Sequence, residues 1–214
     1  MSNLTLAIGR PTLADRFFAR SLVTDVILVA AGAALTAIAA QLVIPIWPVP
    51  ITGQTFAVLF VGAALGATRG ALSLALYLVL GVAGLPVFAA GGHGNLFGST
   101  SGGFVVGFVF AAALTGWLAQ RKWDHRVVGT FVAFAAGTVV IYAFGLPWLY
   151  TVLGTFPAAT MTKFFGTTNV LQATVQGGIL PFLLGDLIKA LIAAAILPLS
   201  WRLISRADAR KDES

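Results

Sequence analysis

The feature that most constrains this chain is a long apolar run, residues 178–201, in which two charged side chains, Asp186 and Lys189, are embedded. A run of this length can cross a bilayer, whose hydrocarbon core needs about 20 apolar residues in a helix. An ionisable side chain at that depth costs roughly 2.5–3.5 kcal/mol on insertion scales, so it normally faces a bundle interior and has a partner. The spacing of three residues places both charges on one helical face. We expect the pair in the outer-to-middle part of a membrane.

The composition supports a membrane protein. Hydrophobic residues make up 58% of the chain and charged residues only 9%, and the mean hydropathy is +0.95. Soluble domains contain about 25% charged residues. We expect an integral membrane protein of one domain over residues 1–214, with a bundle over 21–201 and cytoplasmic tails over 1–20 and 202–214.

Several function classes are excluded by what the sequence lacks. It has no cysteine, and its two histidines, His93 and His125, are too few and too far apart for a metal cluster. It contains no Ser–His–Asp set, no paired acidic motif and no phosphate-binding Gly-x-x-x-x-Gly-Lys-Ser/Thr loop. We therefore expect no enzyme activity, no cofactor and no metal, and we attribute the net charge of +6 to membrane topology rather than to nucleic-acid binding.

Five further apolar segments predict helices over residues 22–43, 56–67, 71–85, 104–118 and 127–146. The sequence leaves open whether the second begins at residue 52 and whether the fifth continues past a proline to residue 153. The sixth helix begins near residue 180, after a connection rich in threonine, glycine and glutamine that has room for a short amphipathic helix. The predicted fold is an all-α bundle of six transmembrane helices.

The distribution of basic residues predicts the orientation of this bundle. If the first helix starts inside, the inner segments hold eleven of the thirteen lysines and arginines, whereas Lys163 alone lies in an outer loop. Such an asymmetry indicates that both termini are cytoplasmic. The eleven residues are Arg10, Arg16, Arg20, Arg69, Arg121, Lys122, Arg126, Arg202, Arg206, Arg210 and Lys211.

Two unusual loops then lie on the outer side, beside the outer end of the last helix. Residues 44–55 contain three prolines and Trp47, and predict an extended, rigid loop. Trp47 is either an interfacial anchor or a lid over a pocket. Residues 84–104 are rich in glycine and form either a simple connection or one wall of a binding site, since irregular backbone at membrane depth normally lines a cavity.

The first helix is rich in small residues. Ala30 and Ala34, and likewise Ala33 and Ala37, are spaced by four residues, a pattern that lets another helix backbone approach closely. The sequence leaves two interpretations equal: packing inside the bundle, or a docking face for a separate subunit. Asp25, near the inner end of this helix, is expected at the membrane interface.

Together these features predict an outward-facing pocket for a small, neutral-headed, partly apolar molecule. A cyclic urea would complement the charged pair, because its N–H groups can donate to Asp186 while its carbonyl accepts from Lys189. The alternative is that the two charges neutralise each other as a structural pair. The expected substrate-binding residues are Asp186, Lys189, Asn95, Gln54, Trp47, Phe88 and Phe97.

Five segments in the same order resemble the BioY family, the substrate-binding (S) components of energy-coupling factor biotin transporters. The resemblance spans most of residues 44–189. It departs from the family pattern at Gly98–Ser101 and at Leu184, and in a longer connection over residues 154–178. The five segments are Ile51–Leu59, Tyr77–Ala89, Gly102–Phe108, Phe144–Trp148 and Pro181–Lys189.

The resemblance implies biotin capture at the cytoplasmic membrane of a prokaryote, with Asp186 and Lys189 as polar contacts to the ligand. It also implies partners, namely a transmembrane coupling subunit, which the first helix would contact, and two cytoplasmic ATPases. Two alternatives stay open: a proton- or ion-coupled secondary transporter in which Asp186 titrates, and an S component for a different vitamin.

Overall fold

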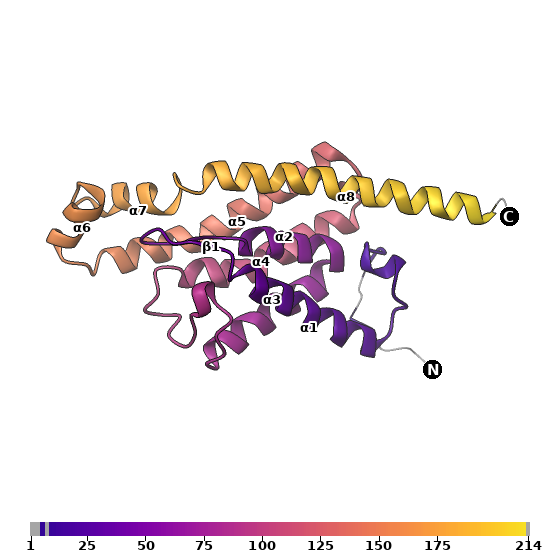
Figure 1. Cartoon of the computed structure of the whole chain (residues 1–214), viewed down its shortest axis with the longest axis horizontal. Coiled ribbons are helices and arrows are strands. Elements are labelled where there is room, and N and C mark those ends of the chain that lie inside the picture. Colours follow the sequence, from indigo (N-terminus) through magenta and orange to yellow (C-terminus); the bar gives the residue numbers. More distant parts are fainter. Residues whose placement is uncertain (1–4, 7–8, 213–214) are drawn as a thin grey trace.

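The computed structural model describes residues 5–6 and 9–212 of the chain, and these residues form a long helical bundle (Figure 1). A two-stranded antiparallel hairpin and three short 3-10 helices complete it. The α-helices are α1 (Leu22–Ala39), α2 (Gln54–Leu65), α3 (Ala67–Val82), α4 (Gly102–Gln120), α5 (Val127–Leu153), α6 (Ala158–Phe165), α7 (Val170–Gly178) and α8 (Leu183–Asp212). The other elements are β1 (Val43–Ile44), β2 (Ile51–Thr52), η1 (Ala14–Arg16), η2 (Ala89–Gly91) and η3 (Trp123–His125).

The helices have the length and surface of a membrane bundle. In the described residues, four helical stretches are long and apolar enough to span a membrane, and α2 and α3 are shorter apolar helices. Many large apolar side chains are exposed, for example Val23 and Ile27 on α1 and Leu187 and Leu191 on α8. Such surfaces are stable when they face lipid. The four stretches are Leu22–Ala39, Gly102–Gln120, Val127–Leu153 and Val170–Arg206.

The six helical segments expected from the sequence correspond to α1–α5 and α8. Helix α1 ends at Ala39 rather than at residue 43. Of the two alternatives for the fifth helix, α5 follows the longer one and passes through Pro147 to Leu153. The connection over 154–178 contains two helices, α6 and α7, of which α7 is capped by the Asn169 side chain accepting from the Gln172 N–H at 3.1 Å. Residues expected to form a rigid extended loop form the β1–β2 hairpin, in which Val43 pairs with Thr52.

Small residues let α4 pack closely against its neighbours α2, α3 and α5. A Cβ atom added at Gly62 of α2 would lie 2.4 Å from the carbonyl oxygen of Ala112, and one added at Gly103 would lie 2.3 Å from the Cβ of Trp148. Both distances are far below van der Waals contact, so only glycine allows these helix backbones to approach this closely.

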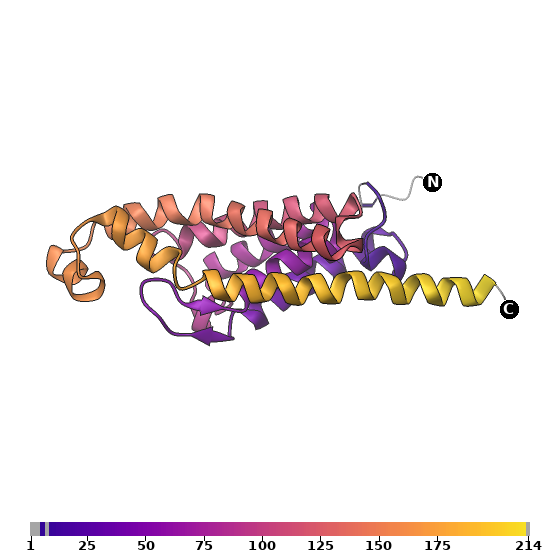
Figure 2. The same ribbon diagram turned by 90° about the horizontal axis from the view of Figure 1, so that it is seen from above.

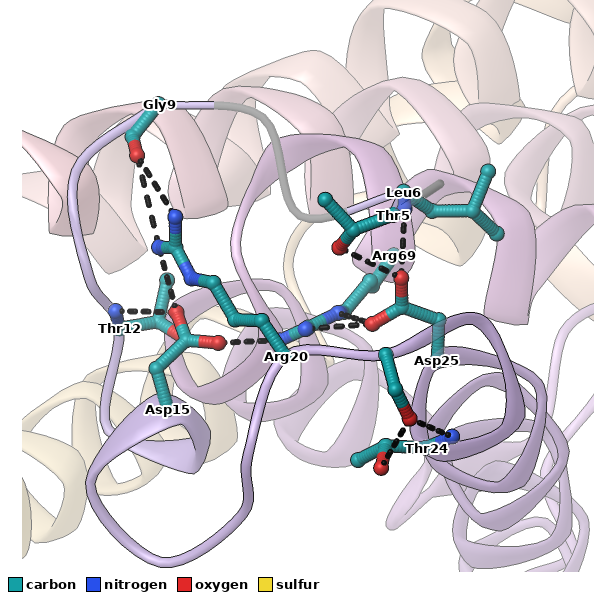
Figure 3. A network of polar contacts seen from close by, with 10 residues as sticks. Thr5, Leu6, Gly9, Thr12, Asp15, Arg20, Thr24, Asp25 and Arg69 are labelled. Atoms are coloured by element: carbon teal, nitrogen blue, oxygen red, sulfur yellow. Dashed lines mark hydrogen bonds and ion pairs between the residues drawn. The ribbon is translucent and has the colours of Figure 1, made fainter. Parts of the chain in front are cut away.

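A buried ion network joins the N-terminal segment to α1 and α3 (Figure 3). The Arg69 guanidinium lies 2.5 Å from Asp25 Oδ1 and 2.8 Å from Asp15 Oδ1. Asp25 also accepts from the Thr5 hydroxyl at 2.9 Å and from the Leu6 N–H at 2.5 Å. The Asp25 side chain, expected near the membrane interface, is fully buried in the protein and paired with Arg69 across 44 residues of sequence.

Asp15 forms the other half of this network. The described part of residues 1–20, expected to be a tail, therefore contacts the bundle. Its Oδ2 accepts from the Thr12 N–H at 2.8 Å and from the Arg20 guanidinium at 2.9 Å. Burial alone would raise the pKa of Asp15, but these hydrogen bonds and that from Arg69 outweigh it and lower the pKa to about 2. The described part of the N-terminal segment is therefore fixed to the bundle by ionised groups.

The start of α1 and the end of α8 lie at the same end of the bundle, and α6 lies at the opposite end (Figure 1). Figure 2 shows that α7 and α8 follow one another along the bundle, with the β1–β2 hairpin beside the point where α7 gives way to α8. We call the end with α6 and the hairpin the α6 end, and the other the terminal end.

Candidate ligand-binding site

A break between α7 and α8 positions the two charged residues of the last apolar run. Helix α7 ends at Gly178 and α8 begins at Leu183, with Pro181 in the break. At about 1.5 Å per residue, Asp186 lies about 4.5 Å and Lys189 about 9 Å along α8. Both are nearer the helix start than a helix beginning at residue 180 would place them. The Asp186 carboxylate thus lies where the helix macrodipole favours negative charge.

Each charge of the pair has a second partner on another helix. Lys189 Nζ lies 3.6 Å from Asp186 Oδ1 and donates a hydrogen bond to the Thr55 hydroxyl of α2 at 2.6 Å. The Tyr142 hydroxyl of α5 donates to Asp186 Oδ2. The Lys189 and Asp186 side chains are 19% and 12% exposed, so they face the bundle rather than lipid and still have accessible surface.

These residues form one wall of a pocket near the α6 end. The cavity between its lining atoms is about 40 Å³, well below the about 300–1,000 Å³ typical of small-molecule sites, so its walls have to move apart to hold a ligand of that size. Its other walls are mostly apolar and aromatic, from the β1–β2 hairpin, α4, α5 and the residue before α8. The lining residues are Val49, Pro50, Thr52, Gln54, Thr55, Ala89, Ser101, Phe104, Val105, Phe108, Thr138, Ile141, Tyr142, Phe182, Asp186 and Lys189.

Gln54 reaches this pocket from the start of α2 and is held by two neighbours. Its Oε1 accepts from the Thr52 hydroxyl at 3.0 Å, and its Nε2 donates to the Tyr77 hydroxyl at 2.5 Å. Tyr77 in turn donates to the Val87 carbonyl at 3.0 Å. This chain of hydrogen bonds fixes the amide and connects the pocket wall to the glycine-rich loop.

Asn95 and Phe88 line a second hollow, which shares Pro50 and Gln54 with the pocket. The Asn95 Oδ1 accepts from the Gly98 N–H at 2.9 Å within its own loop. Phe88 packs edge-on against Tyr77, with 5.5 Å between ring centres. Both residues therefore line a vestibule that adjoins the pocket, and neither lines the pocket that contains the charged pair.

Trp47 and Phe97 line neither the pocket nor the vestibule. Trp47, in the hairpin, packs against Phe164 and Phe165 at the end of α6, with ring centres 4.3 and 5.1 Å apart. Phe97 is 77% exposed and lies against Trp148, 5.8 Å between centres. The contacts of Trp47 join the hairpin to α6 at the same end of the bundle as the pocket.

Sequence reasoning missed several pocket residues, above all Thr55 and Tyr142. Tyr142 is one of only three tyrosines in the chain, and it and Thr138 are the hydroxyl-bearing side chains nearest the middle of the apolar helix α5. That isolation was a signal, because a polar side chain inside a membrane helix normally has a partner. Its partner Asp186 could not be named, since 44 residues separate them.

The small residues of α1 divide between two faces. Ala33 is buried, at 3% exposure, and packs into the core, whereas Ala37 is half-buried. Ala30 and Ala34 are exposed. Internal packing and an outward small-residue face therefore coexist on one helix. In the part of the chain that the structure describes, no group of three His, Cys, Asp or Glu residues could hold a metal ion.

Comparisons with known proteins agree with this architecture. The sequence model of the BioY family matches residues 10–206. Biotin transporter BioY of Rhizobium etli is 39% identical over 158 residues, 70% of this chain and 76% of the relative. Biotin transporter BioY of Thermotoga maritima is 36% identical over 165 residues, 76% of this chain and 87% of the relative.

A solved structure shares the fold as well. The crystal structure of the S-component for biotin from an ECF-type ABC transporter superposes with a TM-score of 0.67 at 26% identity, covering 84% of this chain and 92% of that one. The apolar helices, the family match over nearly the whole described chain and this structural likeness lead to one assignment: the chain belongs to the BioY family of multi-pass prokaryotic membrane proteins.

Proposed function

We propose that this chain captures biotin as the substrate-binding S component of an ECF-type ABC transporter. The observation that carries the proposal is the Asp186–Lys189 pair, which lies in the wall of an apolar pocket in a protein similar to biotin transporters along most of its length. Two buried charges that only neutralised each other would need no adjoining cavity.

The pocket chemistry fits biotin in two orientations. The ureido N–H groups can donate to Asp186, and the ureido carbonyl can accept from Lys189, through charge-assisted hydrogen bonds. Alternatively, Lys189 pairs with the carboxylate of the ligand and Asp186 receives the ureido ring. In both cases Phe104 and Phe182 supply apolar surface for the ring and chain carbons.

We further propose six transmembrane crossings, with both termini cytoplasmic in the membrane of a prokaryote. An even number of crossings is consistent with the start of α1 and the end of α8 lying at one end of the bundle (Figure 1). Helices α2 and α3 have 12 and 16 residues, fewer than the about 20 needed for a full crossing. The hairpin and the glycine-rich loop complete these two crossings at the α6 end.

The proposed partners are a transmembrane coupling subunit and two cytoplasmic ATPases. The sequence has no phosphate-binding loop, so ATP that powers uptake would have to be hydrolysed by another chain. The exposed Ala30 and Ala34 on α1 offer a surface that another helix can approach closely. We propose this face of α1, with Ala33 and Ala37 behind it, as the side that meets the coupling subunit.

The test is calorimetric titration of the detergent-solubilised protein with biotin. We expect 1:1 binding, and losing one charge-assisted hydrogen bond should weaken it about tenfold or more in Asp186→Ala and in Lys189→Ala. Tyr142→Phe should weaken it by less, because it only releases one oxygen of Asp186. Lys163→Ala, an exposed lysine on α6, is the matched control and should bind as the wild type does.

Two results would contradict the proposal. Wild-type affinity retained in both Asp186→Ala and Lys189→Ala would remove the pair from the site. Stabilisation by thiamine or riboflavin but not by biotin in a thermal-shift panel would assign the chain to another vitamin, since a bound ligand stabilises the folded state. Uptake that collapses with a protonophore at constant ATP would favour the ion-coupled alternative.

A further inference from the structure

A basic hollow lies at the terminal end of the bundle, far from the biotin pocket, where the chain passes from α4 through η3 into α5. Four of its residues are basic or imidazole side chains, and no aspartate or glutamate lines it. The lining residues are Arg121, Lys122, Trp123, His125, Arg126, Val128, Gly129 and Val132.

Of the cationic and imidazole groups in this hollow, His125 alone has a described carboxylate nearby, with its Nε2 3.8 Å from Asp124 Oδ1. Among the side chains that the structure describes, no carboxylate lies within ion-pair distance of Lys122 or Arg126. Arg121 stacks over the Trp117 ring at 3.7 Å, which leaves its N–H groups free at the edge of the guanidinium plane. The acid of this segment, Asp124, is buried and accepts from the Trp201 indole N–H at 2.6 Å.

The other side of the hollow is apolar and faces lipid. Val128 and Val132 lie one turn apart on α5 and are 74% and 42% exposed. Trp117 and Trp123 are also exposed, at 44% and 40%, and tryptophan at such a position marks the boundary between headgroups and acyl chains. The hollow therefore has cations at its water side and an apolar track at its lipid side.

We propose that this hollow binds an anionic phospholipid, with the phosphate between Lys122 and Arg126 and an acyl chain along Val128 and Val132. A soluble phosphate would use the cations but not the valines, and a zwitterionic lipid would bring a cation next to Arg126. Basic pockets between helices at a membrane surface suit acidic headgroups. The site depends on the chain being a membrane protein and does not depend on biotin as the substrate.

The test is the thermal stability of the delipidated protein in an uncharged detergent, titrated with dioleoylphosphatidylglycerol. We expect a saturable rise in unfolding temperature, because the lipid binds the folded state. Dioleoylphosphatidylcholine and inorganic phosphate should give no rise. Each lysine or arginine near anionic lipid contributes about 1 kcal/mol, so Lys122→Asn with Arg126→Gln should weaken the apparent affinity about thirty-fold.

The variants are chosen to separate binding from folding. Lys122 has φ 68°, and asparagine tolerates this left-handed conformation. Arg202→Gln with Arg206→Gln removes the same charge from exposed positions on α8 and should stay within about threefold of the wild type. Arg126→Gln alone, at an exposed side chain, should weaken the affinity about fivefold and decides the question if the double variant is not monodisperse.

Three outcomes would overturn the proposal. An unchanged phosphatidylglycerol response in Lys122→Asn/Arg126→Gln, or in Arg126→Gln, would show that the lipid binds elsewhere. An equal response to phosphatidylcholine would show that the charge is irrelevant. A rise with inorganic phosphate equal to that with the lipid would reduce the hollow to a site for free anions.

Discussion

Replacing Arg69 by methionine should destabilise the protein more than almost any other single change at the terminal end. Arg69 is 1% exposed, and its guanidinium lies 2.5 Å from Asp25 and 2.8 Å from Asp15. Asp15 keeps Arg20, whereas Asp25 loses its one ion-pair partner among the described residues. Removing one member of a buried ion pair costs about 3–5 kcal/mol. At about 2–4 °C per kcal/mol for a chain of this size, the melting temperature should fall by about 6–20 °C.

The assay is thermal unfolding followed by tryptophan fluorescence in a mild detergent at pH 7, with Arg202→Met, at an exposed position on α8, as control. Adding Asp15→Asn and Asp25→Asn to Arg69→Met should restore at least half of the loss, since neutral amides carry a far smaller burial cost than carboxylates. Arg69→Met melting within about 2 °C of the control, or a triple variant no more stable than Arg69→Met, would refute this reasoning.

Three further predictions concern pH and packing. Burial raises the pKa of Asp124 to about 6 against its usual 3.8, so the folded state holds the proton more tightly and stability should fall as pH rises from 4 to 6. The fall amounts to about 3 kcal/mol at about 1.4 kcal/mol per pH unit. Unfolding temperatures measured over a pH series should show this fall in the wild type and not in Asp124→Asn. A flat wild-type profile would contradict the assignment. The effect of Asp15 on stability has the opposite pH dependence, because its pKa is lowered to about 2: its stabilising contribution is present above pH 4 and is lost as the pH falls from 4 to 2. The same pH series, extended to acid and compared with Asp15→Asn, measures this loss. Gly103→Ala should cost about 1–3 kcal/mol by overpacking against Trp148, whereas Gly185→Ala, with open space around its Cβ, should not destabilise the protein in the same melt; equal losses would argue against the close packing of α4 on α5.

The helices were predictable because membrane helices are uniformly apolar over a length that the bilayer sets. Their ends were less so. Pro147 lacks an N–H and normally ends a helix, yet α5 continues through it, as membrane helices do when neighbouring groups satisfy the freed carbonyl. The connection over 154–178 was expected to have room for one short amphipathic helix and contains two, α6 and α7, which are hard to predict because each is shorter than ten residues.

The convergence of Gln54, Asp186 and Lys189 followed from counting crossings, which puts both loops and the start of the last helix on one side. Counting crossings does not predict which helices, distant in the sequence, are in contact. The pairing of Asp25 with Arg69 is an example: both were visible as charges in apolar surroundings, but nothing in the sequence states which helices are neighbours. Trp47 and Phe97 do not line the pocket, because their rings pack instead against Phe164 and Trp148.

The break between α7 and α8 uncouples the rotation of α8 about its axis from the length of the chain before it. The buried face of α8 is set by Ala190, Ala193, Leu197 and Trp201, which all follow the break. Residues inserted before the break therefore change the length of the connection between α5 and α8 without rotating Asp186 and Lys189 about their helix. One residue inserted after Lys189 would instead turn the pair by about 100° relative to that face. The length of the α6–α7 connection and the orientation of the two charged side chains are therefore independent of each other.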